Sequence, residues 1–121
     1  MGKILVVEDD RDIRDLLSIR LKGAGHVPVF AADAITTMTV ARKEHPDLIV
    51  LDLGLPGGDG YLVMERLHTM PALASLPVIV ISARDAKANR DRALEAGAVS
   101  FLEKPLDMER LLLTITESLG Q

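Results

Sequence analysis

The chain has 121 residues, enough for one well-buried domain, with a formal net charge of −4 and no cysteine. An acidic chain lacks the basic face that holds nucleic-acid phosphates, and the missing cysteines exclude a disulfide framework, a thiolate metal site and a catalytic thiol. The opening segment MGKILVVEDD is too short for a signal peptide or a membrane span. We therefore expect one cytoplasmic domain over residues 1–121 that binds neither nucleic acid nor membrane directly.

Short apolar runs alternate with longer amphipathic segments along the chain. In chain order the sequence predicts a strand over residues 3–8, a helix over 11–24, a strand over 27–31, a helix over 33–44, a strand over 48–52, a helix over 59–69, a strand over 77–82, a helix over 86–96, a strand over 99–103 and a helix over 107–119. The strands are rich in Val, Ile and Leu and mostly do not alternate with polar residues. This pattern is typical of a parallel sheet that is covered on both faces.

The predicted helices differ in how firmly they should pack. Aspartates at 33 and 107 are good N-caps for the second and last helices. The first helix is expected to bury one face made of Ile13, Leu16, Leu17 and Leu21. The alanine-rich helix over 86–96 offers only Ala93 and Leu94 as core contacts, so it should be the most weakly anchored.

Five strands alternating with five helices predict an α/β fold with a doubly wound parallel sheet, because right-handed crossovers allow few other arrangements. In such sheets ligands bind beyond the carboxyl ends of the strands. The first and third strands should be neighbours. The polar residues at the strand ends are therefore the first candidates for a functional site.

Charged and hydroxyl side chains stand at these strand ends. They are Glu8, Asp9 and Asp10 after the first strand, Asp52 at the third, Ser82 at the fourth and Lys104 after the fifth. Several acids in one pocket repel each other, so such a site should come with a cation. Hard oxygen ligands without nearby His or Cys favour Mg²⁺.

Each of these residues has an ordinary interpretation when taken alone. A single Asp at a strand end is most often a turn or cap residue, and a single Lys is most often solvated. Together, however, Asp52, Ser82 and Lys104 converge on one rim. A carboxylate can attack phosphorus and form an aspartyl phosphate, whose oxygens need Mg²⁺, a hydroxyl group and a lysine.

Four motifs in order carry a resemblance over essentially the whole chain. They are ILVVEDD at 4–10, DLIVLDLGLPGGDG at 47–60, PVIVISA at 77–83 and FLEKPLD at 101–107. With these motifs the sequence resembles the receiver domains of two-component response regulators. The resemblance implies a flavodoxin-like α/β fold of five parallel strands in the order 2-1-3-4-5 with five helices.

The resemblance also implies a role for each matching residue. Asp52 would be the phosphoacceptor, Glu8 and Asp9 the acidic pair that holds Mg²⁺, Gly54 a ligand through its backbone carbonyl, Ser82 and Lys104 the partners of the phosphoryl group, and Phe101 the switch aromatic. Asp9 is the favoured direct ligand. The Lys104–Pro105 peptide bond is expected to be cis.

Such a domain is a signalling switch and not a dedicated enzyme. It would take a phosphoryl group from a phosphohistidine of a sensor histidine kinase or a phosphotransfer protein. Phosphorylation would change the surface made by the 86–96 helix, the fifth strand and the last helix, including Leu113, and so act on an output domain, a partner protein or a second copy. Ile13, Arg14 and Leu17 are the expected contacts for the kinase.

Several alternatives stay open at this point. Asp10 is favoured as a helix cap over a metal ligand, and Phe101 is either plain core or a switch. The resemblance implies that Gly54 and Arg84 tune the dephosphorylation rate, and the sequence leaves the direction of their effect open. Gly57-Gly58 predicts a flexible loop. An aspartyl-intermediate enzyme of the haloacid-dehalogenase type would need an acid at position 54, and a flavodoxin-like cofactor binder would need a phosphate loop in place of the first acids. The chain can stand alone or belong to a longer protein.

Overall fold

The computed structural model describes residues 2–54, 60–83 and 86–120. Its elements are β1 (Lys3–Val7), α1 (Arg11–Gly23), β2 (Val27–Ala31), α2 (Ala34–Glu44), β3 (Leu48–Asp52), α3 (Gly60–Thr69), β4 (Val78–Ser82), α4 (Ala86–Glu95), β5 (Ser100–Glu103) and α5 (Met108–Ser118). The predicted elements are all present, in the predicted order. No helix in these ranges is long and apolar enough to cross a bilayer.

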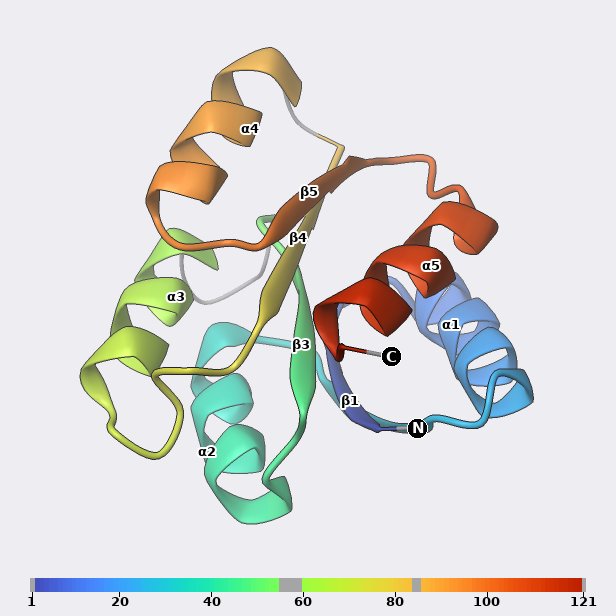
Figure 1. The fold of residues 1–121 in the computed structure, drawn as a ribbon, viewed down its shortest axis with the longest axis horizontal. Helices are drawn as coiled ribbons and strands as arrows, with labels where there is room; N and C mark the ends of the chain where they lie inside the picture. Colours follow the sequence, from blue (N-terminus) through green and yellow to red (C-terminus); the bar gives the residue numbers. More distant parts are fainter. Residues whose placement is uncertain (1, 55–59, 84–85, 121) are drawn as a thin grey trace.

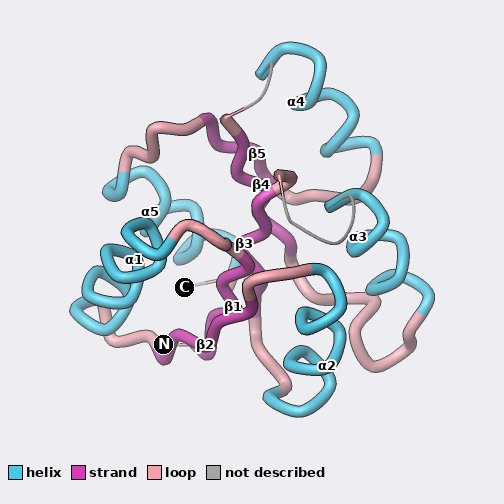
Figure 2. The backbone as a smooth tube through the Cα atoms, turned by 180° about the vertical axis from the view of Figure 1, so that it is seen from behind, coloured by secondary structure: helices cyan, strands magenta, loops and turns pink. Residues whose placement is uncertain are grey.

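The strands form one parallel sheet in the order β2-β1-β3-β4-β5, which confirms the predicted topology. The register pairs Val6 with Val50 and Val50 with Ile79 across the three central strands. Figures 1 and 2 show α1 and α5 on one face of the sheet and α2, α3 and α4 on the other. The central strands are therefore buried on both sides, which explains their continuous apolar runs.

Two apolar cores result from this layering. Successive side chains of β1 point to opposite faces, so Leu5 and Val7 join the core beneath α2 and α3, while Ile4 and Val6 join the core beneath α1 and α5. Leu111 and Ile115 of α5 complete the second core. The alternation fixes the register of each strand, because a slip of one residue would exchange the two cores.

Two expected core residues are exposed instead. Leu16 is 46% exposed although Leu17 and Leu21 of the same helix are buried, and Leu94 is 43% exposed although Ala93 is fully buried. The buried face of α1 is therefore narrower than the apolar stripe that the sequence predicts for this helix, and Leu16 lies outside it. Among the described side chains of α4, only Ala93 is buried, so the expectation of weak apolar anchoring agrees with the burial of this helix.

Aspartate side chains begin three helices, as expected for two of them and favoured for the third. Asp33 accepts a hydrogen bond from the Thr36 amide, and Asp107 caps α5. Asp10 Oδ1 accepts bonds from the amides of Asp12 and Ile13, which decides its assignment in favour of a cap. The cis Lys104–Pro105 peptide bond is also present.

Candidate functional site

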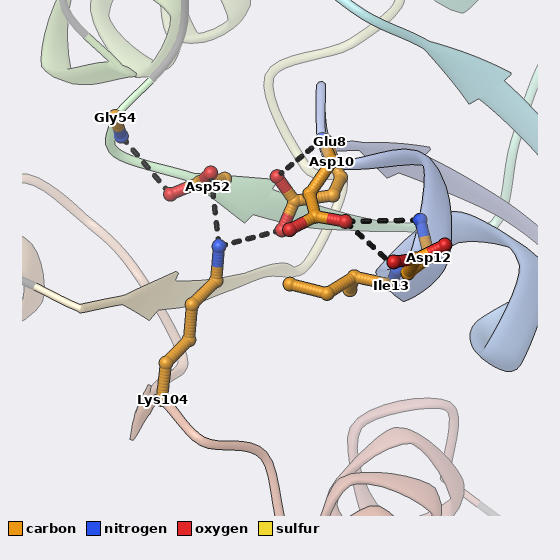
Figure 3. A network of polar contacts seen from close by, with 7 residues as sticks. All are labelled: Glu8, Asp10, Asp12, Ile13, Asp52, Gly54 and Lys104. Atoms are coloured by element: carbon orange, nitrogen blue, oxygen red, sulfur yellow. Dashed lines mark hydrogen bonds and ion pairs between the residues drawn. The ribbon is translucent and has the colours of Figure 1, made fainter.

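The predicted site residues meet at the carboxyl edge of the sheet. Glu8 follows β1, Asp52 ends β3, Ser82 ends β4 and Lys104 follows β5. Because these four strands are consecutive neighbours in the sheet, their carboxyl ends bring the side chains together. Figure 3 shows Glu8, Asp52 and Lys104 pointing toward one another from three different elements.

Lys104 links the two buried carboxylates of the site. Its ammonium group donates to Glu8 Oε1 at 2.6 Å and to Asp52 Oδ2 at 3.1 Å (Figure 3). The backbone of Lys104 is held as well, because its amide donates to the Ser82 carbonyl oxygen at 2.9 Å. The lysine is thereby fixed at the edge of the sheet and partly neutralises the acids there.

Asp52 is 5% exposed, and both oxygens of its carboxylate accept hydrogen bonds from described residues. Oδ1 accepts a hydrogen bond from the Gly54 amide at 3.0 Å, and Oδ2 accepts the bond from Lys104. A Cβ atom at position 54 would lie 3.6 Å from Asp52 Oδ1 and would meet no described residue other than Asp52 within 4 Å. Among the described residues, a side chain at position 54 would therefore lie against the Asp52 carboxylate alone.

The environment of the site raises the pKa values of Glu8 and Lys104. Burial raises the pKa of Glu8 to about 7, and its interaction with the Asp52 side chain adds to the rise, although Lys104 opposes it. Partial burial would lower the pKa of Lys104, but the bond to Glu8 and the charge of Asp52 raise it. The edge thus carries more negative charge than one lysine can balance.

Three of the acids can share a cation. Glu8, Asp9 and Asp52 each place a carboxylate oxygen within 4.8 Å of the others. Both Glu8 oxygens already accept bonds, one from Lys104 and one from the Asp10 amide. Asp9 is exposed and carries no such bond to any residue in the described ranges. An all-oxygen, carboxylate-rich set of this kind fits Mg²⁺, with Asp9 better placed than Glu8 to bind it directly.

Ser82 and Phe101 lie deeper than the acids. Ser82 is fully buried at the end of β4. Phe101 is 3% exposed, packs in the core beneath α2, α3 and α4, and has the Arg90 guanidinium 6.0 Å from its ring centroid. In this conformation Phe101 is a core residue, and its role as a switch stays a prediction.

A small apolar groove beside the site was only partly predicted. It has a volume of about 230 Å³ and is lined by Ile13, Leu16, Lys104, Pro105, Leu106 and Met108. Leu17, expected as a contact for the kinase, is 1% exposed, so that expectation is wrong, whereas Leu16 is 46% exposed and lines the groove. Neighbouring leucines on one helical stripe carry no signal that separates them. The predictions for Arg84, Gly57 and Gly58 concern positions outside the described residues.

Comparison with known proteins gives one consistent assignment. The sequence model of the response regulator receiver domain matches residues 4–116. The chain is 37% identical to the DNA-binding dual master transcriptional regulator RpaA of Synechocystis sp., over 95% of this chain and 48% of that protein. A putative response regulator from Chloroflexus aurantiacus has the same fold, with a TM-score of 0.93 and 29% identity over 99% of this chain and 98% of that one.

A third relative was solved with a metal. The receiver domain of the sensor histidine kinase PA1611 from Pseudomonas aeruginosa has a magnesium ion coordinated in its active site cleft, and it matches with a TM-score of 0.89 and 26% identity over 99% of this chain and 98% of that one. The chain spans about half the length of the curated transcriptional regulators that it matches. Since the family model covers most of the chain and the topology agrees, the chain belongs to the response regulator receiver domain family.

Proposed function

We propose that residues 1–121 form a single receiver domain in which Asp52 accepts a phosphoryl group from a phosphohistidine of a sensor histidine kinase or a phosphotransfer protein. The observation that carries this proposal is the environment of Asp52. Its carboxylate is buried at the sheet edge, accepts a hydrogen bond from the Gly54 amide and lies 3.1 Å from the Lys104 ammonium group.

The transfer needs little from the protein beyond position and charge. An oxygen of Asp52 attacks phosphorus and forms a P–O bond, while the P–N bond breaks and its electron pair stays on the imidazole nitrogen of the donor. Lys104 stabilises the negative charge on the transferred oxygens. Water later attacks the same phosphorus, releases inorganic phosphate and restores the carboxylate.

Mg²⁺ is the cofactor that the acidic cluster supports. Asp9, Asp52 and the Gly54 carbonyl would hold it, with Glu8 positioning the set through Lys104. The ion supplies positive charge that offsets the repulsion between the acids and the incoming phosphoryl group. The magnesium ion in the PA1611 receiver domain gives independent support.

Phosphorylation adds roughly −1.5 to −2 charges at Asp52. Ser82 and Lys104 lie at the ends of the two neighbouring strands on that side of the sheet, so both can bond the new oxygens. A shift of Ser82 would act on α4, which follows β4 in the chain, and on Phe101 in the neighbouring strand β5. The changed surface would comprise α4, β5 and α5, including the exposed Leu113, and would act on an output domain, on a partner protein or on a second copy. RpaA, a DNA-binding regulator, illustrates one kind of output.

The apolar groove next to Lys104 is the proposed contact for the phosphodonor. Ile13 and Leu16 of α1 form one wall, and Pro105 and Met108 form the other. A donor helix that buries an apolar side chain here would lie beside Lys104, whose ammonium group contacts Asp52. This placement provides the orientation that phosphoryl transfer requires.

A direct test uses acetyl phosphate with Mg²⁺. We expect the intact mass to rise by one phosphoryl group, the modification to disappear in Asp52→Asn and on chelation of the metal, and the matched surface variant Asp15→Asn to behave as wild type. An enzyme with an aspartyl intermediate would instead turn over phosphate esters continuously. Absence of any modification with acetyl phosphate and with a phosphohistidine donor would disprove the proposal.

A further inference from the structure

A second groove is lined by residues of α2 and of the end of α3. Figure 1 shows these two helices on the opposite face of the sheet from α1 and α5. The groove has a volume of about 400 Å³. One wall is a helical stripe of α2 that carries Ile35, Met38, Thr39 and Arg42, and the other is formed by Arg66, Thr69 and Met70 at the end of α3. Residues spaced by three and four positions lie on one face of a helix, so each wall is continuous.

The floor of this groove is apolar and adaptable. Met38 belongs to the core beneath α2 and α3, and Met70 packs against that core. Ile35 stands at one end and is 71% exposed, the highest value among the large hydrophobic side chains of the described residues. Methionine side chains adjust their shape to different apolar partners, which suits a recognition surface.

Two unpaired cations flank this floor. The guanidinium groups of Arg42 and Arg66 are exposed, and neither has an ion pair or a hydrogen bond to another described residue. No acidic side chain occurs among the described residues that line the groove. The chain as a whole carries a net charge of −4, so this local positive charge opposes the overall balance.

We propose that this groove is a docking site for an amphipathic helix of a partner protein, with an apolar side chain flanked by carboxylates. The apolar side chain would contact Met38, Met70 and Ile35, and the carboxylates would pair with Arg42 and Arg66. Two parallel helical walls with an apolar floor form the kind of groove in which amphipathic helices bind. The site lies away from Lys104 and from the groove of α1, so it is separate from the phosphodonor contact.

The test uses the full ¹⁵N-labelled chain and a synthetic helical peptide of about 15 residues. The peptide carries a central Leu with Glu one helical turn before and after it, and the matched peptide carries Lys in place of Glu. We expect amide shifts confined to residues 35–42 and 66–70 with the acidic peptide only. The double variant Arg42→Glu/Arg66→Glu should weaken binding by about tenfold or more, and salt should weaken it too.

Control variants keep the experiment decisive. Arg20→Glu/Lys22→Glu makes the same charge change on the last turn of α1 and should bind as wild type. Ile35→Ala removes only an exposed side chain and should weaken binding without lowering the melting temperature. The proposal is wrong if the peptide shifts other regions, if the Lys peptide binds equally well or if no shift appears at millimolar peptide. Concentration-dependent shifts without peptide would assign the groove to a second copy and also overturn it.

Discussion

The ammonium group of Lys104 lies 2.6 Å from Glu8 Oε1, closer than its 3.1 Å to Asp52 Oδ2. The lysine is thus bound most closely to an acid other than Asp52, the proposed phosphoacceptor, and it contacts Asp52 as well. A small rotation would move it from the carboxylates to a phosphoryl oxygen on Asp52. The Glu8–Lys104 pair also has a structural role, because Glu8 is fully buried.

Lys104→Met should lower the free energy of unfolding by about 2 kcal/mol, because it leaves the Glu8 carboxylate buried without its cation. The value is below the roughly 3–5 kcal/mol typical of a fully buried pair, since the lysine itself is partly exposed. Urea unfolding without Mg²⁺ measures it. The double variant Glu8→Gln/Lys104→Met should be more stable than Lys104→Met alone, and additive losses would show that the pair is not coupled.

Gly54→Leu should slow the hydrolysis of phosphorylated Asp52. The new side chain would start 3.6 Å from Asp52 Oδ1 in space that no other described residue occupies, so it would cover the carboxylate without displacing the backbone. We expect a decrease on the order of threefold in the rate, which corresponds to well under 1 kcal/mol in the barrier. The decay of the phosphorylated mass after donor removal gives the rate. Gly54→Ala, which adds only the first carbon, should change it little, and unchanged decay in Gly54→Leu would contradict the shielding argument.

His26 should make the domain less stable in mild acid. Burial lowers the pKa of His26, and its Nδ1 accepts a hydrogen bond from the Gly2 amide, which requires the unprotonated ring. The unfolded chain takes up a proton on His26 near pH 6.5, whereas the folded chain does so only at lower pH. The contribution of His26 to the free energy of unfolding is therefore fully present above this pH and is lost as the pH falls below it. Urea unfolding between about pH 7.5 and 5.5 should show the loss, at most about 1.4 kcal/mol per pH unit.

His26→Gln should remove this part of the pH dependence while other titrating groups remain. His45→Gln, at an exposed position, is the matched control and should keep the wild-type slope. If the His26 variant keeps the same slope as wild type, the buried histidine does not control the acid response.

Tyr61 should restrain α4. Its hydroxyl donates to Asn89 Oδ1 at 2.8 Å, and the Arg92 guanidinium lies 3.8 Å from its ring centroid. Because α4 buries only Ala93 among its described side chains, these contacts should contribute to its attachment to α3. Tyr61→Phe should cost about 1 kcal/mol and speed hydrogen exchange in α4, and Tyr61→Leu should have a larger effect because the cation–π contact is lost too.

Hydrogen exchange measured by mass spectrometry tests this directly, with α2 as the internal reference. The exchange of α2 should not change in either variant. Equal acceleration in both helices would indicate global destabilisation, and no change in α4 would show that Tyr61 does not hold it.

The doubly wound α/β class was predictable from the alternation of strands and helices, because parallel sheets have few allowed topologies. The full strand order came from the resemblance of the four motifs to receiver domains. Once β1, β3, β4 and β5 are neighbours, Glu8, Asp52, Ser82 and Lys104 must meet. Asp10 was also assigned correctly, since an aspartate before a helical stripe is a local signal. The cap follows from a local pattern, and the meeting of the four residues follows from the strand order that the resemblance implied.

Contacts between side chains of different helices and strands were not predictable. Leu16 and Leu17 are adjacent on one stripe, and only the fit of α1 against the sheet decides that Leu17 is buried. The pairs of arginine with aromatic rings, Arg92 with Tyr61 and Arg90 with Phe101, have no periodic signature. The bond from Lys104 to Glu8 depends on the depth of the acid, which the sequence does not specify.

The placement of Asp52 on a strand and of both grooves on helices has a consequence for evolution. The rigid sheet can preserve the phosphate chemistry while exposed positions such as Leu16 and Ile35 change freely. New signalling connections can then arise through a few surface substitutions. A receiver domain built in this way can change its upstream or downstream partner while the residues at the sheet edge stay the same.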